Sequence, residues 1–317
     1  MPLRVREEVR EALAERRAVV ALETSVVAQG LPPGPNLEAA RACEAAARSA
    51  GAVPATVAVI DGEIVVGLEP AELERLAEKN PAHLKIGSRD LAVAVCERKT
   101  GGTTVSATCE IAARAGIRFF ATGGIGGVHR GLAERLDVSQ DLWALSRFPV
   151  AVVCAGAKSV LDLEATLELL ESLAVPVIGI GTGELPSFYS ARSGLQLDHS
   201  VPGAVEAARV CQTRFALGQG GLVLALPPPS ESALGFREVE AWLATALDEA
   251  RRASVVGKAV TPFLLARLGE KSGGRTLRAN VALLEHNARF AAEVAVASAT
   301  MDGDVAEVPA RGEAPRP

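Results

Sequence analysis

The residues best suited to covalent chemistry in this sequence are a lysine and a glutamate, each of which follows an apolar segment. Lys158 comes shortly after the β-branched run 150–153. Glu23 comes directly after the run 19–22. Burial disfavours a charged amine, so Lys158 would be a neutral nucleophile able to form a Schiff base. Burial also favours the protonated form of a carboxyl group, which would suit Glu23 to general acid catalysis. The alternatives are a lysine whose head stays in water and a carboxylate that caps a turn.

A glycine-rich loop, ATGGIGGVHRG at 121–131, lies between these two residues in the chain. Glycines let a backbone approach a ligand closely, and successive N–H groups can hold an anion. The loop does not match a dinucleotide-binding fingerprint, because His129 occupies the position of the third glycine. The segment GAKS at 156–159 resembles the end of a P-loop but does not match it either, because Ala157 separates the glycine from the lysine. The loop is therefore expected to bind a small ligand. The alternatives are a tight structural turn and, for His129, a loop histidine with a satisfied hydrogen bond.

The segment DVSQDL at 137–142 combines two carboxylates with a serine. Ser139 can cap the helix that contains Trp143, with the aspartates favouring its N-terminus. Alternatively, one carboxylate holds a hard divalent metal while the cap region contacts an anion. Lys85 lies in a short apolar segment and is either a surface lysine on an edge strand or a partner for phosphate.

The elements that must position these residues follow an alternating pattern. Short apolar runs alternate with segments of helical period, which predicts an α/β fold with a mixed, mostly parallel sheet covered by helices on both faces. Asp61-Gly62 lies between two β-runs and predicts a hairpin. Ligands of such sheets bind outside the carboxyl ends of strands, where Glu23, the glycine loop and Lys158 should share one cleft. The expected strands are Val19–Leu22, Thr56–Ile60, Ile64–Val66, Leu84–Ile86, Arg118–Ala121, Val150–Cys154, Val177–Ile180 and Leu222–Leu226.

Two helices in the first third of the chain have recognisable ends. Asn36 can cap a helix that stops at Gly51, and Ser88 can cap the segment through Arg98.

The last third of the chain is purely helical in its pattern. No long linker precedes it, so it should form a C-terminal helical cap on the same core, within a single catalytic domain of residues 1–302. Residues 303–317 are polar and rich in Pro, Gly and Glu, and are expected to be a disordered tail. The expected helices are Glu238–Arg252, Thr261–Leu268 and Leu277–Ala297.

Composition narrows the class of protein. With 317 residues the chain can build a large core, and its net charge of −5 argues against a grip on a nucleic-acid backbone. No apolar run reaches the roughly 18 residues of a membrane span, and the charged N-terminal segment lacks the apolar region of a signal peptide. The five cysteines are odd in number and show no CxxC spacing, which indicates a reducing compartment. We therefore expect a cytoplasmic protein that binds a small molecule, without nucleic-acid or membrane partners.

Taken together, several segments resemble the pseudouridine-5′-phosphate glycosidase family. They occur in collinear order, and the resemblance extends from about Val19 to Ala297, with the glycine loop and the CAGAKS segment as its most specific parts. The segments are ALETSVVAQGLP, GAVPATVAVIDGEIVVGL, GGTTVSAT, FATGGIGGVHRG, DVSQDL, VVCAGAKSVLDL and GKAVTPFLLARL.

This resemblance implies an activity and a set of roles. Enzymes of that family reversibly split the C–C bond of pseudouridine 5′-phosphate into uracil and ribose 5-phosphate, with a divalent metal that is typically manganese (Mn2+). The resemblance also implies a homotrimer with a three-layer α/β/α fold. The implied roles are Schiff-base nucleophile for Lys158, proton donor for Glu23, metal ligand for Asp137, and substrate binding for Lys85, Val105, Ser139, Gln140 and Asp141.

The sequence departs from the family pattern in places. Thr24-Ser25 reverses the usual order of the two hydroxyl residues, and Gln140 replaces a usually small residue. The segment 190–202 does not align, and neither His129 nor Asn280 receives a role. Two other functions stay open. One is an aldolase-like or lyase activity on another sugar phosphate, and the other is a catalytically silent sugar-phosphate-binding protein.

Overall fold

A mixed β-sheet forms the centre of the molecule. The computed structural model describes residues 3–131, 136–255 and 260–306. The main sheet has the order β1-β4-β3-β2-β7-β9-β13-β11-β12, and from β3 to β12 all neighbouring strands are parallel. Its strands are β1 (Arg4–Val5), β2 (Val19–Leu22), β3 (Val53–Ile60), β4 (Glu63–Val66), β5 (Leu84–Ile86), β6 (Gly101–Thr103), β7 (Phe119–Ala121), β9 (Ala151–Cys154), β11 (Val177–Ile180), β12 (His199–Val201) and β13 (Leu222–Ala225).

Every predicted strand is present, and the mixed, mostly parallel sheet is confirmed. The predicted hairpin joins the antiparallel strands β3 and β4, and its two turn residues, Asp61 and Gly62, have φ angles of 50° and 82°. Positive φ at both positions is what a type I′ turn requires. Five strands were not predicted (β1, β6, β12 and the antiparallel pair β8, Val128–His129, and β10, Leu161–Asp162), all of only two or three residues.

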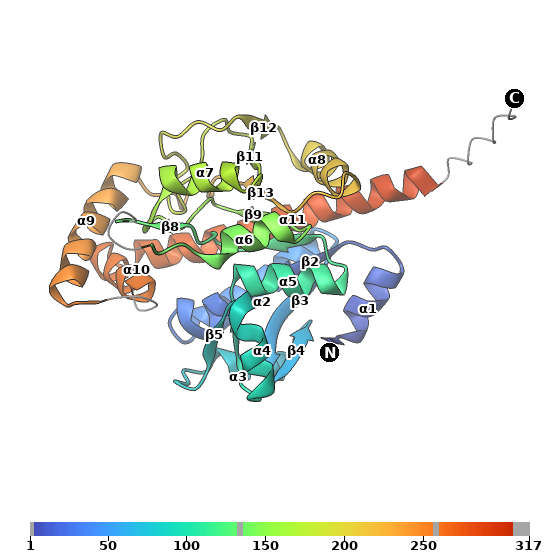
Figure 1. The fold of residues 1–317 in the computed structure, drawn as a ribbon, viewed down its shortest axis with the longest axis horizontal. Coiled ribbons are helices and arrows are strands. Elements are labelled where there is room, and N and C mark those ends of the chain that lie inside the picture. Colours follow the sequence, from blue (N-terminus) through green and yellow to red (C-terminus); the bar gives the residue numbers. More distant parts are fainter. Residues whose placement is uncertain (1–2, 132–135, 256–259, 307–317) are drawn as a thin grey trace, which may run out of the picture.

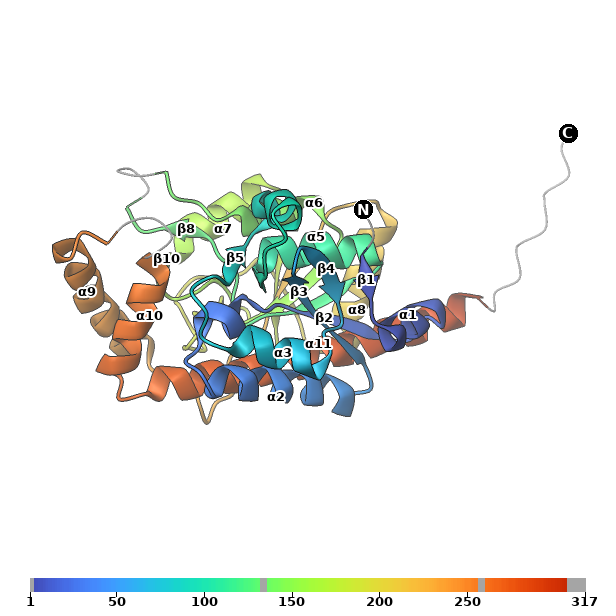
Figure 2. The same cartoon turned by 90° about the horizontal axis from the view of Figure 1, so that it is seen from below.

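Helices cover both faces of this sheet, as Figures 1 and 2 show. One face carries α2 (Pro35–Ser49) and α11 (Arg275–Ala306), and the other carries α5 (Val105–Ala115), α6 (Gln140–Arg147) and α7 (Leu163–Ser172). The arrangement is the three-layer α/β/α fold that the sequence predicted. The remaining helices are α1 (Glu7–Ala14), α3 (Pro70–Ala77), α4 (Leu91–Cys96), α8 (Ala204–Ala216), α9 (Phe236–Arg252) and α10 (Val260–Lys271).

The C-terminal helices are continuous with the same core. Helices α9 and α10 stand at one end of the molecule, and α11 crosses it from that end to the other (Figure 1). On its way α11 packs against β2, β7 and β9, so the predicted cap is joined to the sheet. Because α11 extends to Ala306, it includes the first residues of the predicted tail, 303–306. The rest of that tail lies outside the described residues.

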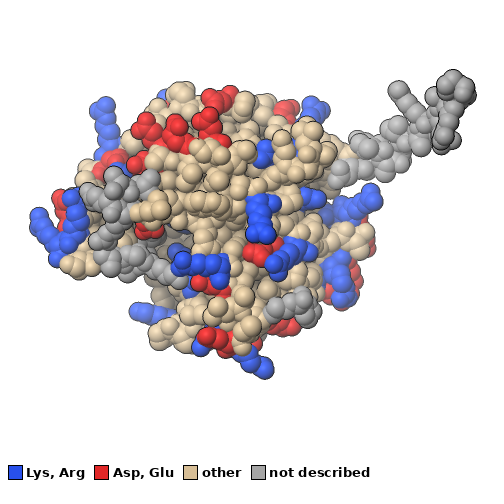
Figure 3. Space-filling view, in the orientation of Figure 1, with Lys and Arg blue, Asp and Glu red and all other residues tan. Residues whose placement is uncertain are grey.

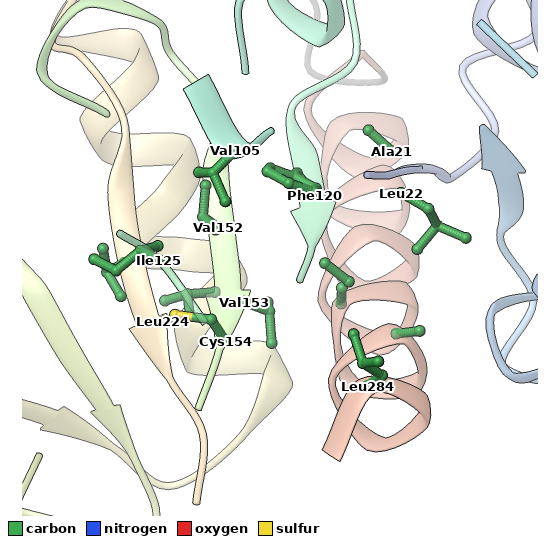
Figure 4. Packing of buried hydrophobic residues seen from close by; sticks show 14 of the residues in the cluster. Ala21, Leu22, Val105, Phe120, Ile125, Val152, Val153, Cys154, Leu224 and Leu284 are labelled. Carbon is green, nitrogen blue, oxygen red and sulfur yellow. The ribbon is translucent and has the colours of Figure 1, made fainter. Parts of the chain in front are cut away.

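Apolar side chains fill both interfaces of the sheet. Figure 4 shows Phe120 of β7 and Val152 of β9 beside Val105 of α5, with Leu284 on α11, and all four residues are buried. The residues of β2, β9 and β13 are all buried. Such uninterrupted apolar strands are typical of a parallel sheet covered on both faces.

Two predicted helix caps are wrong. The residue before α2 is Gly34, and the buried Asn36 instead donates hydrogen bonds of 2.8 Å to the carbonyl oxygens of Val27 and Ala77. The side chain of Asn36 thus links α2 to the π-helix Val26–Gly30 and to the end of α3, and it satisfies two buried carbonyl groups that each need a partner. Ser88 lies inside a short 3-10 helix, Ser88–Asp90, that precedes α4. The predicted cap at Ser139 is confirmed, since its hydroxyl accepts a hydrogen bond from the backbone N–H of Asp141.

The outer surface shown in Figure 3 carries both signs of charge. Acidic side chains gather over α7, where Glu164, Glu168 and Glu171 are exposed. A nucleic-acid backbone would meet like charges over this helix.

Over the described ranges, none of the helices has the length and apolar character needed to cross a membrane.

Candidate active site

A cavity of about 570 Å³ contains three of the predicted site residues, Glu23, Lys85 and Lys158. Glu23 follows β2, Lys158 follows β9 by a tight turn, and Lys85 lies on β5. Further parts of the wall come from the π-helix after Glu23 (Val26–Gly30), the glycine loop, the pair Phe188 and Tyr189, and helices α10 and α11. The predicted convergence at the carboxyl ends of the strands is therefore confirmed.

Glu23 is held by two hydroxyl groups. Its side chain is 8% exposed; Thr122 donates a hydrogen bond to Oε1 and Ser25 donates one to Oε2. Thr24 points away from the cavity, since its hydroxyl donates to the carbonyl oxygen of Val57 at 2.6 Å. With the reversed order, both positions still carry a hydroxyl group. That of Thr24 donates to a carbonyl oxygen of β3, and that of Ser25 donates to Glu23.

Lys158 is presented by a turn that requires glycine. Gly156 has a φ of 79°, and a Cβ atom there would clash with the carbonyl oxygen of Pro186. The backbone N–H of Lys158 then donates to the carbonyl oxygen of Ile125 at 3.1 Å, and its side chain is partly buried. Burial raises the pKa of the Cys154 thiol, at the end of the same strand, to about 12, so this thiol stays protonated and is a poor nucleophile.

The glycine loop forms the wall between these two residues. A Cβ atom on Gly124 would lie 2.6 Å from the ring of Phe188, so the glycine permits close packing as well as access to the cavity. Asn287, fully buried on α11, donates a hydrogen bond of 2.8 Å to the carbonyl oxygen of Thr122. Sequence reasoning missed Asn287; the available signal was a polar residue on the apolar stripe of a long helix.

Asp141 and Val105, both predicted to bind substrate, do not line this cavity. The carboxylate of Asp141 accepts hydrogen bonds from the backbone N–H groups of Ser106 (2.9 Å) and Gly126 (2.8 Å). It therefore fixes the start of α5 to the glycine loop. The side chain of Val105 is buried in the core, so only its backbone can face a ligand. Substrate binding by these residues stays a prediction.

Ser139 and Gln140 are also occupied by contacts within the protein. The hydroxyl of Ser139 accepts from the N–H of Asp141 at 3.2 Å, and Oε1 of Gln140 accepts from the N–H of Arg89 at 3.2 Å. Neither residue lies in the cavity wall. Their proposed contact with substrate therefore also stays a prediction.

His129 lies among the charged groups of the site. Burial lowers the pKa of His129, the positive charges of Lys85 and Lys158 lower it further, and Asp137 opposes them. The backbone N–H of His129 also donates to the carbonyl oxygen of Asp137 at 2.9 Å. The hydrogen bond places His129 directly beside Asp137, the predicted metal ligand.

The donor set near Asp137 is small. Throughout the described ranges there is no group of three or more His, Cys, Asp or Glu side chains that would hold a metal ion. A hard divalent cation prefers carboxylate oxygens and water, and can be held by one or two carboxylates together with substrate phosphate. The described residues therefore fit a largely hydrated ion held by one or two protein ligands, of which Asp137 is the predicted one.

Two regions left unassigned by the sequence are now placed. Asn280, on α11, lines the cavity and is 7% exposed. The segment 190–202 contributes no residue to that wall and instead contains β12, which pairs with β11. Beside it, the rings of Phe188 and Tyr189 form an edge-to-face pair, 4.7 Å between centroids, in the cavity wall.

Fold and site define a three-layer α/β protein whose cavity combines a lysine with a buried carboxyl group at the ends of parallel strands. Comparison with known proteins is consistent with this class. A model of the family described as "Indigoidine synthase A like protein" matches residues 8–297, and the chain belongs to that family.

Named relatives match the chain along nearly its whole length. A pseudouridine-5′-phosphate glycosidase of Myxococcus xanthus is 61% identical over 300 residues, which are 94% of this chain and 99% of that protein. One of Solibacter usitatus is 49% identical over 93% of this chain and 99% of its own. Among solved structures, the prealnumycin C-glycosynthase AlnA in complex with ribulose 5-phosphate has a TM-score of 0.88 and 39% identity, covering 95% of this chain and 98% of that one. An indigoidine synthase A-like protein from Thermotoga maritima has a TM-score of 0.84 and 37% identity, covering 93% and 95%.

Proposed function

We propose that this chain is a pseudouridine-5′-phosphate glycosidase. It would reversibly cleave the C–C glycosidic bond of pseudouridine 5′-phosphate to give uracil and ribose 5-phosphate. The observation that carries the proposal is the shared cavity of Lys158, Glu23 and Lys85. The names of relatives up to 61% identical support it, as does the ribulose 5-phosphate bound to a structural neighbour.

The first step opens the sugar ring. A C-glycoside has no heteroatom leaving group between sugar and base, so protonation of a glycosidic oxygen is not available. The amine of Lys158, in its deprotonated form, attacks C1′ and the C1′–O4′ bond breaks. The proton that the nitrogen releases passes to O4′, which leaves as a hydroxyl. The product is an open-chain adduct in which the lysine nitrogen is bonded to C1′.

The second step breaks the C–C bond. Glu23 gives its proton to C5 of the uracil ring, and the C1′–C5 bond pair passes to the base. The nitrogen of Lys158 supplies its lone pair to C1′, which leaves a Schiff base on the enzyme. Water then hydrolyses the Schiff base and releases ribose 5-phosphate. Ser25 and Thr122 hold the carboxyl group, and as hydroxyls they can donate to its ionised form or accept from its protonated form.

Lys85 would bind the phosphate group, since it is a cation in the wall of the cavity that also contains Lys158 and Glu23. Holding the phosphate fixes one end of a flexible open chain, and orientation of this kind lowers the barrier. For the metal we propose Mn2+ on Asp137, where it would orient and polarise water or sugar hydroxyl groups.

The proposal extends to assembly and location. The family resemblance leads us to propose a homotrimer, and the free state of all five cysteines is in keeping with a reducing cytoplasm. Sedimentation of the purified protein would test the trimeric state, and fractionation of cells that express it would test the cytoplasmic location.

The decisive experiment is uracil release from pseudouridine 5′-phosphate in the presence of Mn2+, with Lys158→Ala in parallel. The expected result is release by the wild type and none by the variant. If neither release nor the reverse condensation occurs, borohydride trapping with other sugar phosphates tests the aldolase-like alternative. Binding without turnover by both proteins would identify a silent binding protein.

A further inference from the structure

Arg130, the residue after His129, makes contacts that the proposed reaction does not use. Its Nε donates to the carbonyl oxygen of Leu161 at 3.2 Å, and its Nη2 donates to the carbonyl oxygen of Ser159 at 3.3 Å. The same guanidinium group forms a two-point ion pair with Glu240 at 3.0 and 2.8 Å. The partly buried side chain of Arg130 therefore donates hydrogen bonds to two carbonyl groups and one carboxylate.

The two carbonyl groups belong to the turn that presents Lys158. The N–H of Leu161 donates to the carbonyl oxygen of Lys158 at 3.0 Å, so residues 158–161 form one closed turn. Ser159 does not hold this turn through its own side chain, because its buried hydroxyl has no hydrogen-bond partner among the described residues. Arg130 therefore clamps the turn directly after the nucleophile.

Glu240 connects this clamp to the helical cap. It lies on α9, which packs against α10, and α10 contributes part of the cavity wall. A second two-point ion pair, between Glu238 of α9 and Arg275, also anchors this helix, at 2.7 and 3.1 Å. Arg275 makes no contact with the turn at Lys158 in any described hydrogen bond, and it does not line the cavity. Of the two arginines, only Arg130 donates hydrogen bonds to the turn at Lys158 within the described residues, whereas Arg275 stacks on the ring of Trp242.

We propose that Arg130 is a positioning residue for Lys158, and that Glu240 orients its guanidinium group so that docking of the helical cap and placement of the nucleophile are coupled. A planar guanidinium can satisfy two carbonyl groups and one carboxylate together, which a lysine cannot do. The inference rests on the proposed function only in taking Lys158 as the nucleophile. It goes beyond that function in assigning a role to the cap.

The test compares Arg130→Gln with Arg275→Gln, a matched loss of one arginine from one α9 ion pair. Borohydride trapping of ribose 5-phosphate on Lys158, located by peptide mapping, measures nucleophile placement independently of C–C cleavage. For Arg130→Gln we expect a fall of about 10- to 100-fold in trapping rate and in kcat, because misplacement of a reacting group by about 1 Å has effects of this size. KM should change little, and both variants should lose similar thermal stability. Arg275→Gln should trap at the wild-type rate.

A second pair of variants keeps the proposal falsifiable if Arg130→Gln fails to fold. Glu240→Gln should slow trapping, whereas Glu238→Gln should not. Equal trapping rates in the Glu240 and Glu238 variants would overturn the coupling to the cap. A wild-type rate for a folded Arg130→Gln would overturn the positioning role. A wild-type protein that traps no ribose 5-phosphate would instead overturn the proposed function itself.

Discussion

The hydroxyl group of Thr122 donates a hydrogen bond to Glu23 from the end of the neighbouring strand. The register of β2 and β7 pairs Leu22 with Ala121, so the two residues that follow are adjacent across the sheet. Although 99 positions separate them in the chain, parallel pairing alone places a donor against the carboxyl group. The pairing of Ala121 with Val153 extends this arrangement to β9, which leads to Lys158.

Removing that hydroxyl should slow the reaction without preventing Schiff-base formation. Thr122→Val keeps the shape of the side chain but leaves Glu23 with one donor. Because hydrogen bonds to charged groups contribute about 1.5–3 kcal/mol, we expect kcat for uracil release to fall about 10- to 100-fold. Trapping of ribose 5-phosphate should continue at the wild-type rate. Thr122→Ser should restore most of the activity, and an equally impaired serine variant would contradict the role of the hydroxyl.

Replacing the acid itself should separate the two chemical steps. Glu23→Gln preserves the hydrogen bonds of Ser25 and Thr122, since hydroxyl groups can accept from the amide as well as donate to it. Uracil release should fall on the order of 100-fold or more, the usual contribution of a general acid. Borohydride trapping by this variant measures the lysine alone. Loss of trapping together with release would show that Glu23 acts on Lys158 rather than on the base.

The sequence predicted the sheet and the cavity because both depend on local patterns. Buried strands, the Asp61-Gly62 turn and polar residues at strand ends can each be recognised from neighbouring residues. The missed strands have only two or three residues, too few to show a period of two. The false caps at Asn36 and Ser88 arose because a capping residue type was read without its tertiary partners.

The contacts of Asn287 and Arg130, which support the site from outside the cavity, could not be predicted from the sequence because their partners are distant along the chain. Asn287 and Arg130 act on carbonyl groups that are 165 and about 30 positions away, and a carbonyl group carries no side-chain signal. The structure places the predicted site residues in different surroundings. Lys158 and Glu23 lie in the cavity, whereas the carboxylate of Asp141 is taken up by backbone N–H groups.

Asn287 should contribute to stability as well as to the shape of the site. Its amide is the link between α11 and the glycine loop, through the carbonyl oxygen of Thr122. Asn287→Ala would leave that buried carbonyl without this donor, and we expect a loss of about 1–3 kcal/mol in the free energy of unfolding. Asn280→Ala, on the same helix but facing the cavity, is the matched control. Denaturant unfolding of the two variants measures the difference, and equal losses would contradict the link.

The ion pair at the hairpin turn should make the stability of the fold depend on pH in the acidic range. The hydrogen bond from Arg75, opposed by burial and assisted by a hydrogen bond from Thr100, lowers the pKa of Asp61 to about 2, below the value of about 3.9 for an unfolded chain. A depressed carboxyl pKa adds stability that is complete above the unfolded value and is lost as the pH falls toward the folded value. Asp61→Asn removes the charge and keeps the turn, because asparagine also tolerates the positive φ of 50° at this position. The variant should therefore be less stable than the wild type at pH 5–7, and the difference should shrink between about pH 4 and pH 2. Denaturant midpoints measured across this range test the expectation, and a difference that stays constant with pH would mean that the ion pair does not set it.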